Sequence, residues 1–70
     1  MKRYARRLLR EAATKKWLTV KGTFTENVRE ALELRNFTEA HKICIREKRR
    51  RFELVLKFPN DEDDVVLPMG

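Results

Sequence analysis

The most constraining segment of this sequence is residues 52–58 (FELVLKF), in which large apolar side chains recur at every second position. This spacing is typical of a β-strand, whose successive side chains point to opposite faces of a sheet. Val55 adds an apolar side chain on the second face, which favours a place inside a sheet. Pro59 ends this strand, and residues 65–67 (VVL) predict a short closing strand before Pro68.

A helix is expected near the start of the chain, over residues 3–15, because no Gly or Pro interrupts a helical spacing of apolar residues there. One face of this helix would carry the apolar residues Tyr4, Ala5, Leu8, Leu9, Ala12 and Ala13. The opposite face would carry the basic residues Arg3, Arg6, Arg7 and Arg10. The pattern therefore predicts an amphipathic helix with a row of arginines.

A short strand is expected over residues 17–21 (WLTVK), which are rich in β-forming side chains and end at Gly22. Thr23 and Glu26 then have the spacing of a capping box, which predicts the start of a central helix. That helix would end near Asn36, a residue type that tolerates the left-handed conformation at a helix end. It would bury Val28, Ala31 and Leu32.

Residues 37–51 fit two structures. As a strand, Ile43 and Ile45 alternate, and the segment would form a hairpin with residues 52–58 around Lys48 and Arg49. As a helix, Asn36 or Thr38 would cap the start, with an apolar strip of Ala40, Ile43 and Cys44. We favour the strand, because the apolar residues that a helix would need end after Ile45.

The predicted fold is a single α+β domain over residues 1–70. Its order is an N-terminal helix, a short strand, a central helix and a small antiparallel β-sheet or hairpin. The helical alternative for residues 37–51 changes this order to one that resembles a winged helix. That resemblance implies a helix-turn-helix pair over residues 24–34 and 38–50, with a two-stranded hairpin behind it.

Charge is concentrated in three segments of this 70-residue chain, whose net charge is +6. Residues 1–16 carry a net +6, residues 46–51 (REKRRR) carry +4, and residues 52–70 carry −4 because of the acidic run 61–64. Residues 17–45 are neutral overall. Two cationic segments with a separate anionic one focus an electric field better than scattered charges do. We expect the acidic run to be a solvated loop.

Catalytic and metal chemistry have few candidate residues. His41 and Cys44 are the one histidine and the one cysteine, so neither an intrachain disulfide nor a four-ligand zinc site of these types can form. We interpret them as a polar surface residue and a small buried apolar residue. The sequence therefore predicts a protein that is not an enzyme and has no cofactor or metal.

The charge pattern predicts a nucleic-acid-binding protein of regulatory function, with DNA as the partner in preference to RNA. The expected contact residues are Arg3, Arg6, Arg7, Arg10, Lys15, Lys16, Lys48, Arg49, Arg50 and Arg51. The alternative is a basic interaction module or inhibitor that docks on an acidic surface of a larger protein. No apolar run reaches the roughly 20 residues of a membrane span, so we expect no membrane contact and a cytoplasmic location.

A symmetric homodimer is also expected. A chain this short has a thin core and often gains stability by association. Because residues 52–58 are apolar on both faces, this strand favours a place inside a sheet, which two copies of the chain could complete.

Overall fold

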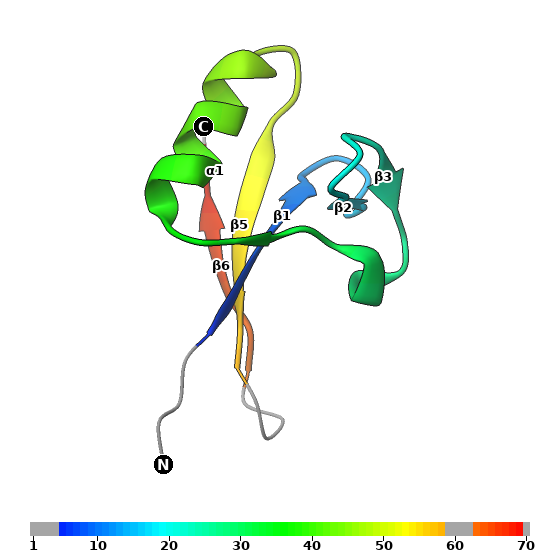
Figure 1. Cartoon of the computed structure of the whole chain (residues 1–70), viewed down its shortest axis with the longest axis vertical. Coiled ribbons are helices and arrows are strands. Elements are labelled where there is room, and N and C mark those ends of the chain that lie inside the picture. Colours follow the sequence, from blue (N-terminus) through cyan, green and yellow to red (C-terminus); the bar gives the residue numbers. More distant parts are fainter. Residues whose placement is uncertain (1–4, 59–62, 70) are drawn as a thin grey trace.

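The computed structural model describes residues 5–58 and 63–69, which form a six-stranded antiparallel sheet, one α-helix and a short 3₁₀ helix (Figure 1). The elements are β1 (Arg6–Glu11), β2 (Trp17–Leu18), β3 (Phe24–Thr25), η1 (Val28–Glu30), β4 (Glu33–Leu34), α1 (Phe37–Arg46), β5 (Phe52–Lys57) and β6 (Val65–Pro68). The mixed α+β class is confirmed. The predicted order is wrong, because the described chain begins with a strand and its α-helix lies in the middle.

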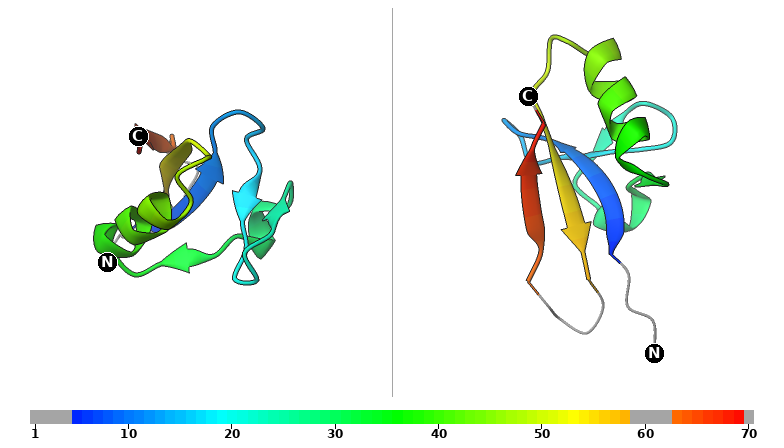
Figure 2. Two further views of the ribbon diagram at one scale, coloured as in Figure 1. Left: turned by 90° about the horizontal axis from the view of Figure 1, so that it is seen from above. Right: turned by 90° about the vertical axis from the view of Figure 1, so that its left-hand side faces the viewer.

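The sheet is organised around β1 and β5. Its strand order is β3-β2-β1-β5-β6, and β4 pairs with the same edge of β1 as β2 does. The β1–β5 register extends over the full length of both strands, from Arg6 opposite Lys57 to Glu11 opposite Phe52. Figure 2 shows β1, β5 and β6 side by side as the long strands, with α1 on one face of them. The predicted strands 52–58 and 65–67 correspond to β5 and β6 and are confirmed.

The predicted helix over residues 3–15 is wrong, because its central part is β1. Leu8 and Leu9 are both fully buried and lie in two different apolar clusters on opposite faces of the sheet. Adjacent residues reach opposite faces in a strand, whereas in a helix they share one side. Burial of Leu8 and Leu9 on opposite faces of the sheet stabilises the strand more than the helix propensity of the surrounding Ala, Arg and Leu residues would stabilise a helix.

The predicted central helix is also wrong, since its span holds β3, η1 and β4. Thr23 belongs to a turn instead of a capping box: its hydroxyl lies 2.8 Å from that of Thr19, and Gly22 adopts a φ of 83°. Val28 then packs on the cluster around Leu8, while Leu32 packs on the cluster around Leu9. One helix face could not supply both sides of the sheet. The predicted strand 17–21 is shorter than expected and consists of β2.

Residues 37–51 contain α1, so the strand that we favoured is wrong and the helical alternative is correct. The Asn36 side chain accepts a hydrogen bond from the backbone N–H of Glu39 at 3.0 Å, and the Glu39 carboxylate accepts one from the backbone N–H of Arg35. Ala40 and Ile43 are buried against the sheet. The winged-helix order does not form, because residues 24–34 contain no α-helix.

Residues 52–58 lie inside the sheet of a single chain, as their two apolar faces predicted. β5 lies between β1 and β6 and is hydrogen-bonded to both of them. Its second apolar face is covered within the same chain, where Val55 packs with Leu8 and Trp17. A second copy therefore has no free edge of β5 to pair with.

The capping role of Asn36 can be tested directly. Asn36→Ala should lower the free energy of unfolding by about 0.5–2 kcal/mol, because the first turn of α1 loses its side-chain acceptor. Asn36→Asp keeps an acceptor oxygen and should stay close to the wild type. Urea unfolding followed by far-UV circular dichroism measures both variants, and an Asn36→Ala protein as stable as the wild type would contradict the cap.

Candidate nucleic-acid interface

The second basic segment forms the connection between α1 and β5, at the top of Figure 1. Lys48, Arg49, Arg50 and Arg51 are all exposed there. The connection follows the C-terminal end of α1, where the carbonyl groups give the helix its negative end and favour neighbouring cations. One basic residue is enough to interact with the negative end of the helix. The four consecutive basic residues here also make this end of the molecule positively charged.

The turn between β1 and β2 lies directly beside this connection. The backbone N–H of Ala12 donates to the carbonyl of Arg51 at 2.9 Å. The turn carries Lys15 and Lys16, and Lys15 has a left-handed φ of 62°. The antiparallel β1–β5 register thus joins two basic segments that are distant in the sequence. We call the combined surface the cationic end and define it as Lys15, Lys16, Arg46, Lys48, Arg49, Arg50 and Arg51.

Glu11 and Glu53 form hydrogen bonds with basic residues in and beside the cationic end. The Glu11 carboxylate accepts a hydrogen bond from Arg50 Nη1 at 2.7 Å. The Glu53 carboxylate accepts from Arg10 Nε at 2.7 Å and from Lys15 Nζ at 3.0 Å. Hydrogen bonds from Thr14 and Arg50 lower the pKa of Glu11, and those from Arg10 and Lys15 lower the pKa of Glu53. Both carboxylates therefore stay ionised to lower pH than an ordinary glutamate.

Aromatic rings fix two of the same arginines. The guanidinium of Arg50 lies 4.7 Å from the ring centroid of Phe24, and that of Arg10 lies 5.6 Å from the ring of Trp17. A cation over an aromatic face within about 6 Å is attracted by the ring quadrupole. Arg10 and Arg50 thus have partners on two sides, which makes them structural parts of the fold.

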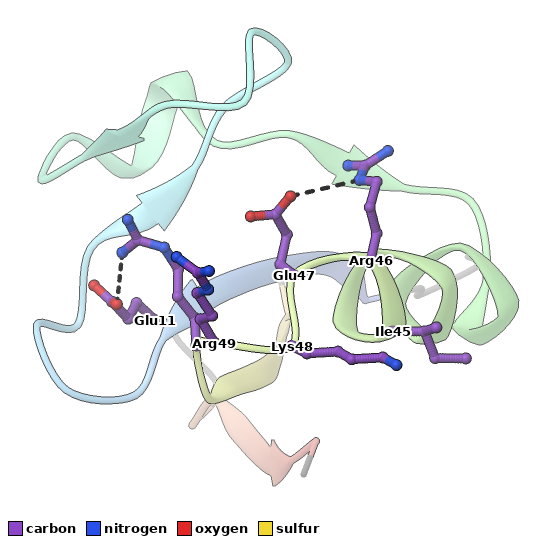
Figure 3. A pocket seen from close by; sticks show the side chains of 7 residues that line it. Glu11, Ile45, Arg46, Glu47, Lys48 and Arg49 are labelled. Carbon is purple, nitrogen blue, oxygen red and sulfur yellow. Dashed lines mark hydrogen bonds and ion pairs between the residues drawn. The ribbon is translucent and has the colours of Figure 1, made fainter.

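A hollow of about 610 Å³ lies within the cationic end (Figure 3). It is lined by Glu11, Ile45, Arg46, Glu47, Lys48, Arg49 and Arg50. Arg46 Nε lies 3.7 Å from a Glu47 carboxylate oxygen, and Figure 3 shows this pair on the opposite side of the hollow from Glu11. The hollow is open to solvent and lined mainly by charged groups, so it suits an anion better than an apolar ligand.

The predicted arginine row does not exist as a single face. Arg6 pairs with Glu33 at 2.9 Å, while Arg7 lies on the other face of the sheet with its guanidinium 5.8 Å from the ring of Phe37. Arg3 lies outside the described residues. Within the part of the chain that the structure describes, Lys16, Lys48, Arg49 and Arg51 make no ion pair.

Arg46 belongs to this surface but is not among the contact residues that the charge pattern predicts. It is the first residue of the REKRRR segment, and the last turn of α1 places it on the wall of the hollow. The sequence indicates this residue only through its place in a six-residue segment that contains five basic residues, Arg46 included. The position of the helix end, which the sequence left open, decides that it joins the surface.

His41 and Cys44 lie one helical turn apart on α1. His41 is exposed, whereas Cys44 is half-buried, and burial raises the pKa of its thiol. A thiol is a nucleophile only as the thiolate, so this environment disfavours reactivity. Among residues 5–58 and 63–69, no group of three or more His, Cys, Asp or Glu side chains has the arrangement of a metal site.

Comparisons of this chain with protein-family models, with curated proteins and with solved structures give no match. In the described residues, no helix has both the length and the apolar character that crossing a membrane requires.

The lowered pKa values of Glu11 and Glu53 predict a loss of stability in acid. A carboxyl whose pKa is lower in the folded chain contributes stability above its ordinary pKa of 4.5, and this is lost as the pH falls through the lowered value. Glu53→Gln should flatten the decrease in unfolding free energy below pH 4.5, measured by urea unfolding from neutral to acidic pH. Glu26→Gln, at an exposed position, is the control; an equal flattening in both variants would contradict the assignment.

Proposed function

We propose that this protein binds nucleic acid through the cationic end, with duplex DNA as the partner in preference to RNA. The observation that carries the proposal is the junction of two basic segments, in which the backbone of Ala12 is hydrogen-bonded to that of Arg51. This contact gathers lysines and arginines from both segments on one surface. Each phosphate that such a side chain neutralises releases counterions, which is the main source of sequence-independent affinity.

We divide the basic residues of this surface, and the neighbouring Arg10, into two classes. Arg10, Lys15 and Arg50 already hold carboxylates, so removing them would disturb the fold as well as the charge. Lys48, Arg49 and Arg51 are exposed and have no ion pair among the described residues. We assign phosphate contact to these three residues and to Lys16. Arginine's planar fork also suits the bidentate recognition of phosphate and of guanine edges.

A regulatory role is the second part of the proposal. A protein that contacts phosphates alone binds all sequences with similar affinity, whereas regulation at a site needs contacts with base edges or a response to DNA shape. Arg49 lines the hollow, and we assign to it contact with a base edge in addition to phosphate contact. An Arg49→Lys variant keeps the charge and loses the planar fork, so it should reduce discrimination between sequences more than overall affinity.

The proposal predicts a specific change in salt dependence. Wild-type protein should retard a random DNA duplex in a gel at about 50 mM salt, with affinity falling steeply as the salt concentration rises. Replacing Lys48, Arg49 and Arg51 together by alanine should weaken binding to every sequence. The slope of log K against log salt should become shallower by about 0.9 for each phosphate that the variant no longer neutralises.

A charge-matched control separates local contact from total charge. Replacing Lys21, Arg29 and Arg35 by alanine removes the same charge from exposed positions outside the α1–β5 connection. This variant should keep most of the affinity and the salt slope. Equal losses in both triple variants would overturn the assignment to the cationic end. Absence of any wild-type complex with DNA or RNA would overturn the proposal and favour an acidic protein partner for this surface.

A further inference from the structure

We propose that β6 is a dimerisation edge, at which two copies of this chain pair their β6 strands antiparallel around Val66. This inference does not depend on nucleic-acid binding. β6 lies at one end of the sheet order and pairs with β5 on one side. In Figure 2 it is the outermost of the long strands. No other described strand covers its outer side, which leaves a row of backbone groups free to pair.

The exposed side chains of β6 are apolar. Val65 is 40% exposed and Val66 is 39% exposed, and these neighbours point to opposite faces of the sheet. Exposed sheet edges in monomeric proteins commonly carry lysine or other charged side chains that prevent association. The described strand β6 has none. The apolar side chains and the open edge of β6 therefore suit pairing with another apolar strand. The β6 strand of a second copy of this chain is such a strand.

Hydrogen bonding determines the register of the proposed pair. The backbone N–H of Met69 donates to the carbonyl of Phe52 at 2.9 Å. Because this direction alternates along an antiparallel ladder, Val65 and Leu67 also face β5, while Val66 and Pro68 face outward. Pro68 lacks an N–H, so its outward position costs no bond within its own sheet. Val66 is therefore the residue of β6 that offers both a donor and an acceptor to a partner.

A register centred on Val66 uses these groups best. Val66 and the partner's Val66 would exchange two N–H···O bonds across the two-fold axis. The N–H of Asp64 would donate to the carbonyl of the partner's Pro68. Because Pro68 has no N–H, this pair would form one hydrogen bond instead of two. Val65 would lie opposite the partner's Leu67 on the face that carries α1. A centre at Pro68 would instead place two residues without an N–H opposite each other.

Charge selects the antiparallel orientation. β6 begins after Asp63 and Asp64, and it ends beside Phe52, which follows the basic run Lys48–Arg51 directly. Antiparallel pairing places the acidic start of each β6 near the cationic end of the partner, twice in the dimer. A parallel arrangement would place acid beside acid. In this register Asp63 would lie two strand spacings, about 10 Å, from the partner's Phe52, which adjoins the partner's Arg51, and this distance is close to the Debye length at about 0.1 M salt. Asp64 would lie at the same spacing from the partner's Glu53, an acid that Arg10 and Lys15 of its own chain already pair with.

Disulfide trapping tests the register. In a hydrogen-bonded antiparallel pair the two Cα atoms are about 5.5 Å apart, which suits a disulfide. Val66→Cys, made together with Cys44→Ala, should form a covalent dimer with oxidised glutathione as the oxidant. The control is Val20→Cys in the same background, because Val20 is 78% exposed and lies outside β6. Equal cross-linking of both variants, or none at Val66, would overturn the proposed register.

Sedimentation equilibrium without nucleic acid tests the dimer itself. Wild-type protein should approach twice the chain mass of 8.4 kDa as its concentration rises. Val66→Lys places like charges opposite each other and should remain a folded monomer by circular dichroism, whereas Val20→Lys should dimerise like the wild type. A wild-type mass of one chain across the whole series would overturn the proposal, whatever the outcome of the DNA experiments.

A matched pair of charge reversals tests the orientation. Asp63→Lys changes the charge at the start of β6, and Glu26→Lys makes the same change at an exposed position outside the long strands. At low salt, Asp63→Lys should raise the dimer dissociation constant several-fold more than Glu26→Lys does. High salt should reduce this difference because it screens the charges. Equal dissociation constants at low salt would overturn the antiparallel orientation.

Discussion

The antiparallel pairing of β1 with β5 is the interaction on which the rest of the structure depends. Both strands are buried on their two faces, because Leu8 packs with Val55 in one cluster and Leu9 packs with Leu54 in the other. Because this strand pair is apolar on both faces, other residues must shield each face from water. α1 covers one face through Ala40 and Ile43. Trp17, Val28 and Ala31 cover the other. Among the short strands, β2 contributes to both covers, through Leu18 on the first face and Trp17 on the second.

The same pairing determines where the charges lie. Because the end of β1 meets the start of β5, the basic turn after β1 and the basic connection before β5 form one surface. Glu11 and Glu53 lie at this junction and form ion pairs with Arg50, Arg10 and Lys15. The glutamates thus reduce the repulsion that assembly of the surface would otherwise create. The basic residues that remain without a described ion pair are the ones that we assign to phosphate binding.

The long strands separate opposite charges at their two ends. The cationic end lies where β5 begins, and the acidic residues Asp63 and Asp64 lie where β6 begins, at the other end of the same strands. Lys57 neutralises one of these acids, Asp64, within the chain at 2.9 Å. An arrangement of opposite charges along an open sheet edge favours an antiparallel neighbour. The proposed nucleic-acid contacts and the proposed dimer contact therefore use different residues, and separate variants test them.

The sequence by itself determined the parts of the fold that local patterns specify. Alternation in residues 52–58 identified β5, the VVL segment before Pro68 identified β6, and Asn36 was recognised as one possible helix cap. Uneven charge identified most of the candidate surface. Only the tertiary structure decided that Leu8 and Leu9 lie in a strand, because the spacing of apolar residues in 3–15 fits a helix equally well. The physical reason is that a local pattern records which residues are apolar, whereas burial on one face or two depends on partners distant in the chain.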